Sequence, residues 1–148
     1  MAVHVVTELV IERPLEVVSS YAANPDNAPE WYQNIEAVAW ETSPPLTKGS
    51  RVAFVARFLG RRLEYTYEIG RYEPGSILVM ATAQGPFPME TTYTWTAVTE
   101  GSTRMTLGNR GEPAGFSKVT APVMAAAMKR ANDKDLANLR AILEAQGS

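Results

Sequence analysis

Apolar and polar residues alternate along most of the chain up to residue 111, which is the pattern of half-buried β-strands. Glycine and proline residues separate the alternating segments, and they mark turns between strands. The pattern predicts strands over residues 3–12, 35–41, 51–59, 62–72, 77–83, 89–98 and 103–111.

The alternation is clearest in the segments 51–59 and 62–72, which flank a tight turn at Gly60 and predict a β-hairpin. The inward positions of the first segment are Val52, Phe54, Ala56 and Phe58. Those of the second are Leu63, Tyr65, Tyr67 and Ile69, and its outward positions are Arg62, Glu64, Thr66 and Glu68.

Two short helices are expected between the first two strands. Pro14 suits the first turn of a helix, and the apolar stripe that follows it consists of Leu15, Val18, Tyr21 and Ala22. The sequence Asn24-Pro25-Asp26 ends this helix, and we expect Asp26 to cap a second one that runs to about Tyr32.

The pattern changes to a helical period from about Gly115 to Gln146, and the residues expected on the buried face of the helix are three or four positions apart. These positions are Ala125, Met128, Asn132, Leu136, Leu139 and Leu143. A helix of about 30 residues is roughly 45 Å long. The sheet must bury one face against it, so the sequence predicts an α+β fold with a void between a curved antiparallel sheet and this helix.

Composition bounds the remaining choices. At 148 residues, with 45% hydrophobic and 20% charged residues, residues 1–148 are expected to form a single domain. The chain has no cysteine, which excludes disulfides, thiolate nucleophiles and cysteine metal sites. With a net charge of -2 the chain lacks the excess of basic residues that nucleic-acid-binding proteins carry, so nucleic acid is not an expected partner. No apolar run approaches the ~20 residues of a membrane span.

The N-terminal residues carry His4 and Glu8 within their apolar stretch and lack the basic start of a secretory signal, so a cytoplasmic location is expected. Val6, Val10 and Val55 face outward by parity, and a homodimer through such a surface is one expectation.

The order of elements, with residues 14–18 (PLEVV) and 24–31 (NPDNAPEW), resembles the polyketide cyclase/dehydrase (SRPBCC) branch of the START/Bet v 1-like superfamily. The stretches 56–62, 85–90 and 109–113 are also similar to bacterial members. The resemblance implies the helix-grip fold: a seven-stranded sheet in the order 1-7-6-5-4-3-2 around a long C-terminal helix. It implies a ligand cavity, in a superfamily of lipid-binding, quinone-binding, Hsp90-activating and aromatase/cyclase proteins.

Aromatic and thioether side chains at inward parity together suit a cavity for a planar apolar ligand, although for each residue taken alone the simpler interpretation is that it fills the core. The predicted cavity-lining residues are Phe54, Phe58, Tyr65, Tyr67, Phe87, Tyr93, Trp95, Asn109, Met124 and Met128. Buried tyrosine hydroxyls need partners, and water or a ligand would supply them.

Three polar or aromatic residues have two interpretations each. Asn109 either holds a ligand carbonyl or bonds to the backbone near a bulge expected from Gly108 and Gly111. The same bulge would bring Arg110 to the cavity mouth, where it pairs with a ligand anion or with Glu112. Trp31 either covers the entrance or packs between the short helices and the sheet.

The sequence identifies no catalytic residue. The single histidine, His4, is predicted on the outer face, and neither paired carboxylates nor a metal-ligand cluster faces the cavity. No metal and no cofactor are therefore expected.

The leading functional hypothesis is binding of a small hydrophobic or aromatic molecule of the lipid, quinone or polyketide type. One alternative is a cyclase/dehydratase-like enzyme, in which Tyr65, Tyr67, Tyr93, Asn109 and Arg110 would act as hydrogen-bond donors. A further alternative is an interaction module like the Hsp90 activators.

Overall fold

The elements of the fold follow the order that the hydrophobic pattern predicts. The computed structural model describes residues 2–112 and 120–147. The strands are β1 (Val3–Ile11), β2 (Ile35–Trp40), β3 (Arg51–Phe58), β4 (Arg61–Glu73), β5 (Ile77–Gln84), β6 (Met89–Thr99) and β7 (Ser102–Gly111). Every predicted strand is confirmed to within one residue at each end.

The helices are α1 (Leu15–Ala23), a short 3-10 helix η1 (Pro25–Asn27), α2 (Ala28–Trp31) and α3 (Ala121–Gln146). Residues 115–119, which the sequence assigned to the start of the last helix, lie outside the described residues. None of the described helices combines the length and the apolar composition that a membrane span requires.

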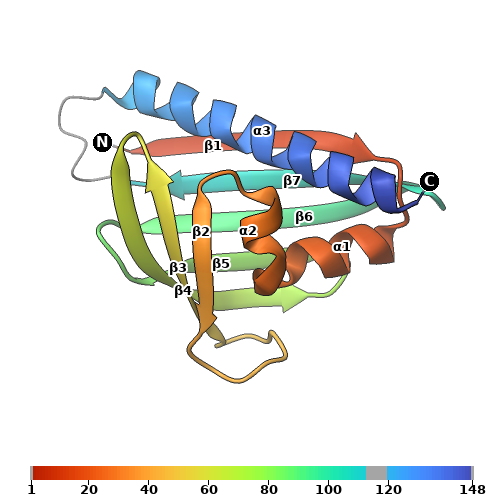
Figure 1. The fold of residues 1–148 in the computed structure, drawn as a ribbon, viewed down its shortest axis with the longest axis horizontal. Helices are drawn as coiled ribbons and strands as arrows, with labels where there is room; N and C mark the ends of the chain where they lie inside the picture. Colours follow the sequence, from red (N-terminus) through yellow and green to blue (C-terminus); the bar gives the residue numbers. More distant parts are fainter. Residues whose placement is uncertain (1, 113–119, 148) are drawn as a thin grey trace.

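The strands form one antiparallel sheet in the order β1-β7-β6-β5-β4-β3-β2, so the predicted strand order is confirmed. The first strand pairs with the last, and Val5 lies opposite Asn109. Irregularities in pairing interrupt β2, β4 and the β6–β7 ladder. Such bulges increase the bend of a strand. The sheet accordingly curls, and α3 crosses its concave side (Figure 1).

The long helix packs against the sheet through two separate apolar clusters. Near its start, Met124 and Met128 pack with residues of β1 and β4. Toward its end, Leu136, Leu139 and Leu143 join the main core, which includes α1 and the middle of the sheet. Between these two clusters α3 presents two buried polar residues, Asn132 and Asp135.

The segment between β1 and β2 differs in detail from the prediction. The expected second helix is divided into η1 and α2, and its capping residue is Asn24 rather than Asp26. The Asn24 side chain accepts a hydrogen bond from the Asp26 amide at 3.1 Å. Asp26 instead accepts one from the Trp40 indole at 2.9 Å. The Asp26 carboxylate thus connects the 3-10 helix η1 to the end of β2.

The hairpin of β3 and β4 alternates as predicted, with one exception. Thr66, expected on the exposed face, is buried. Its hydroxyl donates to Glu41 at 2.9 Å, and the β4–β5 register shifts between Thr66 and Tyr67. Parity alone does not predict this burial, because it depends on a residue from a loop distant in sequence.

Candidate functional site

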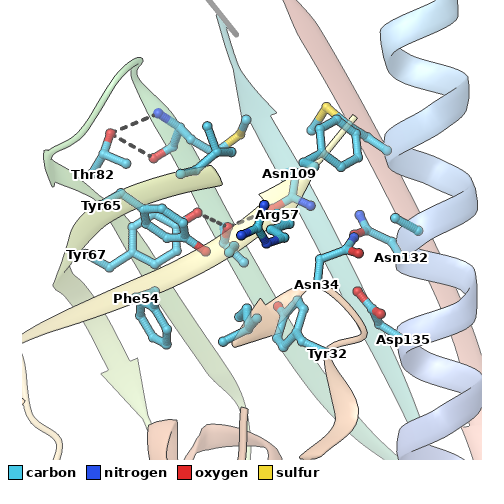
Figure 2. A pocket seen from close by; sticks show the side chains of 18 of the residues that line it. Tyr32, Asn34, Phe54, Arg57, Tyr65, Tyr67, Thr82, Asn109, Asn132 and Asp135 are labelled. Carbon is cyan, nitrogen blue, oxygen red and sulfur yellow. Dashed lines mark hydrogen bonds between the residues drawn. The ribbon is translucent and has the colours of Figure 1, made fainter. Parts of the chain in front are cut away.

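A cavity of about 150 Å³ lies between the concave face of the sheet and α3. Strands β3 to β7, the β5–β6 turn, the segment after α2 and the first half of α3 all contribute to its wall. Most of the predicted site residues line it: Phe54, Phe58, Tyr65, Tyr67, Phe87, Tyr93, Asn109, Met124 and Met128. Alternation places the strand residues on one face, and curvature of the sheet directs them toward a common space (Figure 2).

The wall formed by β3 and β4 is aromatic. Phe54 and Tyr65 lie opposite each other in the ladder, with ring centroids 5.6 Å apart and planes 27° apart. Tyr67 meets the Tyr65 ring edge-on at 5.1 Å. Offset-stacked and edge-to-face rings are favourable arrangements that hold each other in place. This aromatic wall therefore offers an apolar surface to a guest molecule.

The other three predicted residues do not line the cavity. Trp95 is buried beside Tyr93, where the space over the sheet is filled by core residues. Trp31 is completely buried and packs between α2 and the sheet. Arg110 is exposed on the outer face and pairs with Glu90 at 3.1 Å rather than with Glu112.

The position of Arg110 follows from a regular β7 strand. The bulge that we expected from Gly108 and Gly111 does not occur in the described pairing with β1 and β6, whose register is continuous through both glycines. Strict alternation then turns Asn109 inward and Arg110 outward.

Hydrogen bonds connect the cavity hydroxyls. The Thr91 hydroxyl donates to Asn109 Oδ1 at 2.7 Å, and its oxygen lies 2.7 Å from the Tyr67 hydroxyl. Because Thr91 has a single hydroxyl proton, Tyr67 must be the donor in the second bond. The chain from Tyr67 through Thr91 thus fixes the Asn109 carbonyl and leaves its amide protons free to face the cavity. Burial raises the pKa of Tyr67 to about 12, so its hydroxyl stays protonated at neutral pH.

A second pair of hydroxyls lies beside the first, where Tyr32 and Tyr93 oxygens are 2.5 Å apart. Burial raises the pKa of both groups above that of a free tyrosine. The Tyr65 hydroxyl differs from these, since it has no hydrogen-bond partner among the described residues.

The sequence analysis missed a buried carboxyl group on the cavity wall. Asp135 is 3% exposed and accepts a hydrogen bond from the Gln33 amide at 2.9 Å. Burial raises the pKa of Asp135 to about 6, although the bond from Gln33 acts in the opposite direction. Asp135 follows Asn132 by three positions on the buried stripe of α3, and that spacing was the signal that could have identified it.

Asn132 itself was assigned to the stripe but not to the site. It lines the cavity, is 5% exposed, and its Nδ2 atom has no partner among the described residues. Asn34 and Arg57 also line the cavity and were not predicted (Figure 2). Tyr32, which the sequence places inward near the entrance, lines the cavity as well.

The chemistry available at this site is limited. Within the described residues, no group of three or more His, Asp or Glu side chains could hold a metal ion. The charged residues of the described cavity wall are Asp135 and Arg57. The Arg57 side chain forms an ion pair with Glu36 at 2.6 Å. A mostly apolar cavity with a few fixed polar groups is typical of small-molecule sites.

Solved structures with low sequence identity share this fold. A START superfamily protein from Mycobacterium smegmatis has a TM-score of 0.85 at 13% identity, over 97% of this chain and 98% of that one. The Zhui aromatase/cyclase from Streptomyces sp. R1128 has a TM-score of 0.80 at 14% identity, over 100% and 97% of the two chains. The major latex-like protein 151 of Panax ginseng has a TM-score of 0.74 at 14% identity, over 95% and 96%.

Among curated proteins, none matches this sequence. A family model described as polyketide cyclase / dehydrase and lipid transport matches residues 2–144, which is nearly the whole chain. The chain therefore belongs to the polyketide cyclase/dehydrase and lipid transport family.

Proposed function

We propose that this protein binds a small, largely apolar molecule that contains an aromatic ring in the cavity beneath α3. The observation that carries the proposal is a cavity of about 150 Å³ with an aromatic wall on one side and methionines on the other. An apolar protein cavity of about 150 Å³ is known to accept benzene. Membership of a family that includes lipid transport supports a binding role.

The shape of the wall favours a ring over a flexible chain. Phe54, Tyr65 and Tyr67 hold one another by ring contacts, so their surface is present before a ligand arrives. A planar guest gains area against this surface without ordering many rotatable bonds. Met124 and Met128 on the opposite wall adapt to guests of different outline, because methionine is unbranched and flexible.

A cavity-filling substitution tests this proposal. Ala131 lies on α3 and lines the cavity, and Ala131→Leu would occupy part of its volume. The matched control is Ala137→Leu, at an exposed position of the same helix. Calorimetric titration with 2-naphthol should show binding to the wild type and the control and at least about tenfold weaker binding to Ala131→Leu. Equal affinity for all three proteins would place the bound probe elsewhere and contradict the proposal.

A second candidate function is proton transfer during cyclisation or dehydration of a carbonyl compound. Asp135 favours it, because a carboxyl group with a pKa of about 6 is largely ionised at neutral pH and is a better base than an ordinary carboxylate. The neighbouring Tyr32 and Tyr93 hydroxyls could donate to an enolate oxygen.

Exchange of the α-protons of 2-tetralone in D2O, followed by NMR, tests this candidate. The wild type should accelerate exchange, and Asp135→Asn should abolish the acceleration while retaining affinity for the probe. Unchanged acceleration in the variant would leave binding as the only proposed role.

A further inference from the structure

We propose that Asn132 anchors an uncharged acceptor oxygen of the ligand, so that the ligand class is an aromatic carbonyl compound such as an aryl ketone or a quinone. This inference rests on the proposed binding function and assigns the polar contact that selects the ligand. The observation behind it is a buried amide donor on the cavity wall that has no partner among the described residues.

Two amides elsewhere in the described chain are used structurally. Asn138 donates to the backbone oxygens of Glu30 and Trp31, each at 3.2 Å. Asn27 donates to the Tyr21 carbonyl at 3.1 Å. Asn132 differs, because it is 5% exposed and its Nδ2 atom has no acceptor within residues 2–112 and 120–147. An unpaired buried donor destabilises the folded state, and such a group in a native protein calls for an explanation.

The position of Asn132 explains why its partner would be a ligand. Its side chain and that of Asp135 project from α3 into the cavity, on the side opposite Tyr65 and Tyr67 (Figure 2). A ring placed against the aromatic wall would direct a substituent on its far side toward Asn132. The amide nitrogen carries two protons and no available lone pair, so it recognises an acceptor.

The charges around the cavity favour a neutral acceptor over an anion. Asp135 lies one helical turn from Asn132, and its carboxylate would repel a ligand carboxylate. The basic residue in the described wall, Arg57, already pairs with Glu36 and is largely exposed. A carbonyl oxygen accepts a hydrogen bond from the amide and brings no charge into this region. A fatty acid anion or benzoate would bring a negative charge close to Asp135.

Two probes of nearly identical shape test the assignment. Acetophenone carries a C=O group at the position where α-methylstyrene carries a C=CH2 group. For the wild type we expect acetophenone to bind about tenfold more tightly than α-methylstyrene, the difference that one buried hydrogen bond produces. Benzoate at pH 7.5 should bind at least about tenfold more weakly than acetophenone.

The Asn132→Leu variant keeps the size of the side chain and removes the donor. It should bind both neutral probes with equal affinity, while Asn138→Leu, on the same helix but outside the cavity wall, should retain the preference for acetophenone. Thermal melts monitored by circular dichroism establish that each variant is folded. In the wild type, the side-chain amide resonance of Asn132 should shift with acetophenone and not with α-methylstyrene.

The outcomes separate this inference from the function on which it rests. If the wild type binds both neutral probes equally, or if Asn132→Leu keeps the preference, the inference is overturned and the binding function stands. If the preference disappears in Asn109→Leu and survives in Asn132→Leu, the anchor lies on β7 and the inference is again overturned. If no aromatic probe binds, the binding function fails and the inference fails with it.

Discussion

The hydroxyl oxygens of Tyr32 and Tyr93 lie 2.5 Å apart inside the protein and join the segment after α2 to β6. The Tyr32 ring also packs on Trp31, with centroids 4.1 Å apart. Both tyrosines line the cavity. The two tyrosines therefore connect the segment that follows the short helices to the middle of the sheet.

Removing one of these hydroxyls should destabilise the protein. Tyr93→Phe leaves the Tyr32 hydroxyl buried without its partner, and we expect a loss of about 1–2 kcal/mol in the free energy of unfolding. The double variant Tyr32→Phe/Tyr93→Phe should lose less than the sum of the two single variants. Urea unfolding of the four proteins measures this coupling, and strictly additive losses would show that the two hydroxyls do not interact.

Tyr72→Phe is the matched control for that measurement. Tyr72 is partly buried, and its hydroxyl has no hydrogen-bond partner among the described residues. Its replacement should change the free energy of unfolding by less than about 0.5 kcal/mol.

Asp135 should make stability depend on pH in the acid range. Its pKa is raised from 3.8 to about 6 in the folded protein, so the folded state binds the proton more tightly than the unfolded state. The cost of ionisation is fully present above the folded pKa, decreases as the pH falls from about 6 to about 4, and vanishes below the unfolded pKa. Asp135→Asn, which keeps an oxygen to accept the Gln33 amide, removes this cost.

The variant should therefore be more stable than the wild type at pH 7 by about 3 kcal/mol, since each pKa unit corresponds to about 1.4 kcal/mol. The difference should shrink to nearly zero at about pH 4. Urea unfolding at intervals of half a pH unit measures it. A difference that stays constant across this range would contradict the raised pKa.

Gly111 allows the close approach of β7 to the turn that precedes β6. A Cβ atom on Gly111 would lie 2.4 Å from the Pro88 carbonyl oxygen and 3.0 Å from the Met89 Cα. Gly111→Ala must therefore displace backbone beside Phe87 and Met89, which both line the cavity. We expect a loss of about 1–3 kcal/mol in the free energy of unfolding, with weaker binding of 2-naphthol.

Gly101→Ala is the control for steric crowding, because a Cβ atom there meets nothing within 4 Å. Its midpoint in urea should match that of the wild type. Equal destabilisation by both alanine variants would indicate that flexibility, and not the contact with Pro88, explains the requirement for glycine at position 111.

Tyr65 and Tyr67 should respond differently to loss of their hydroxyls. Tyr67→Phe breaks the bond to Thr91 and releases the chain that fixes Asn109, so we expect a loss of about 1 kcal/mol in the free energy of unfolding. Tyr65→Phe removes a hydroxyl without a partner in the described structure and should leave stability unchanged. Chemical denaturation distinguishes the two, and an equal loss in both variants would contradict the hydrogen-bond assignment.

The sequence alone determined the order of elements and most of the aromatic wall of the cavity. The strands alternate with a period of two, so parity was enough to place Phe54, Tyr65, Tyr67 and Tyr93 on the concave face. The strand order came from the resemblance to a known family rather than from the residues. A local pattern specifies which face of a strand is buried, but it contains no information about which strands become neighbours.

Only the tertiary structure decided where the buried face encloses space and where it is filled. Trp95 has the same parity as Tyr93, yet it packs in the core and not on the cavity wall. In the sequence Asn132 and Asp135 interrupt an apolar stripe, and their place on the cavity wall depends on how α3 packs against the sheet through two separate apolar clusters. Burial, unpaired donors and raised pKa values arise from contacts between distant segments, which periodicity along the chain does not contain.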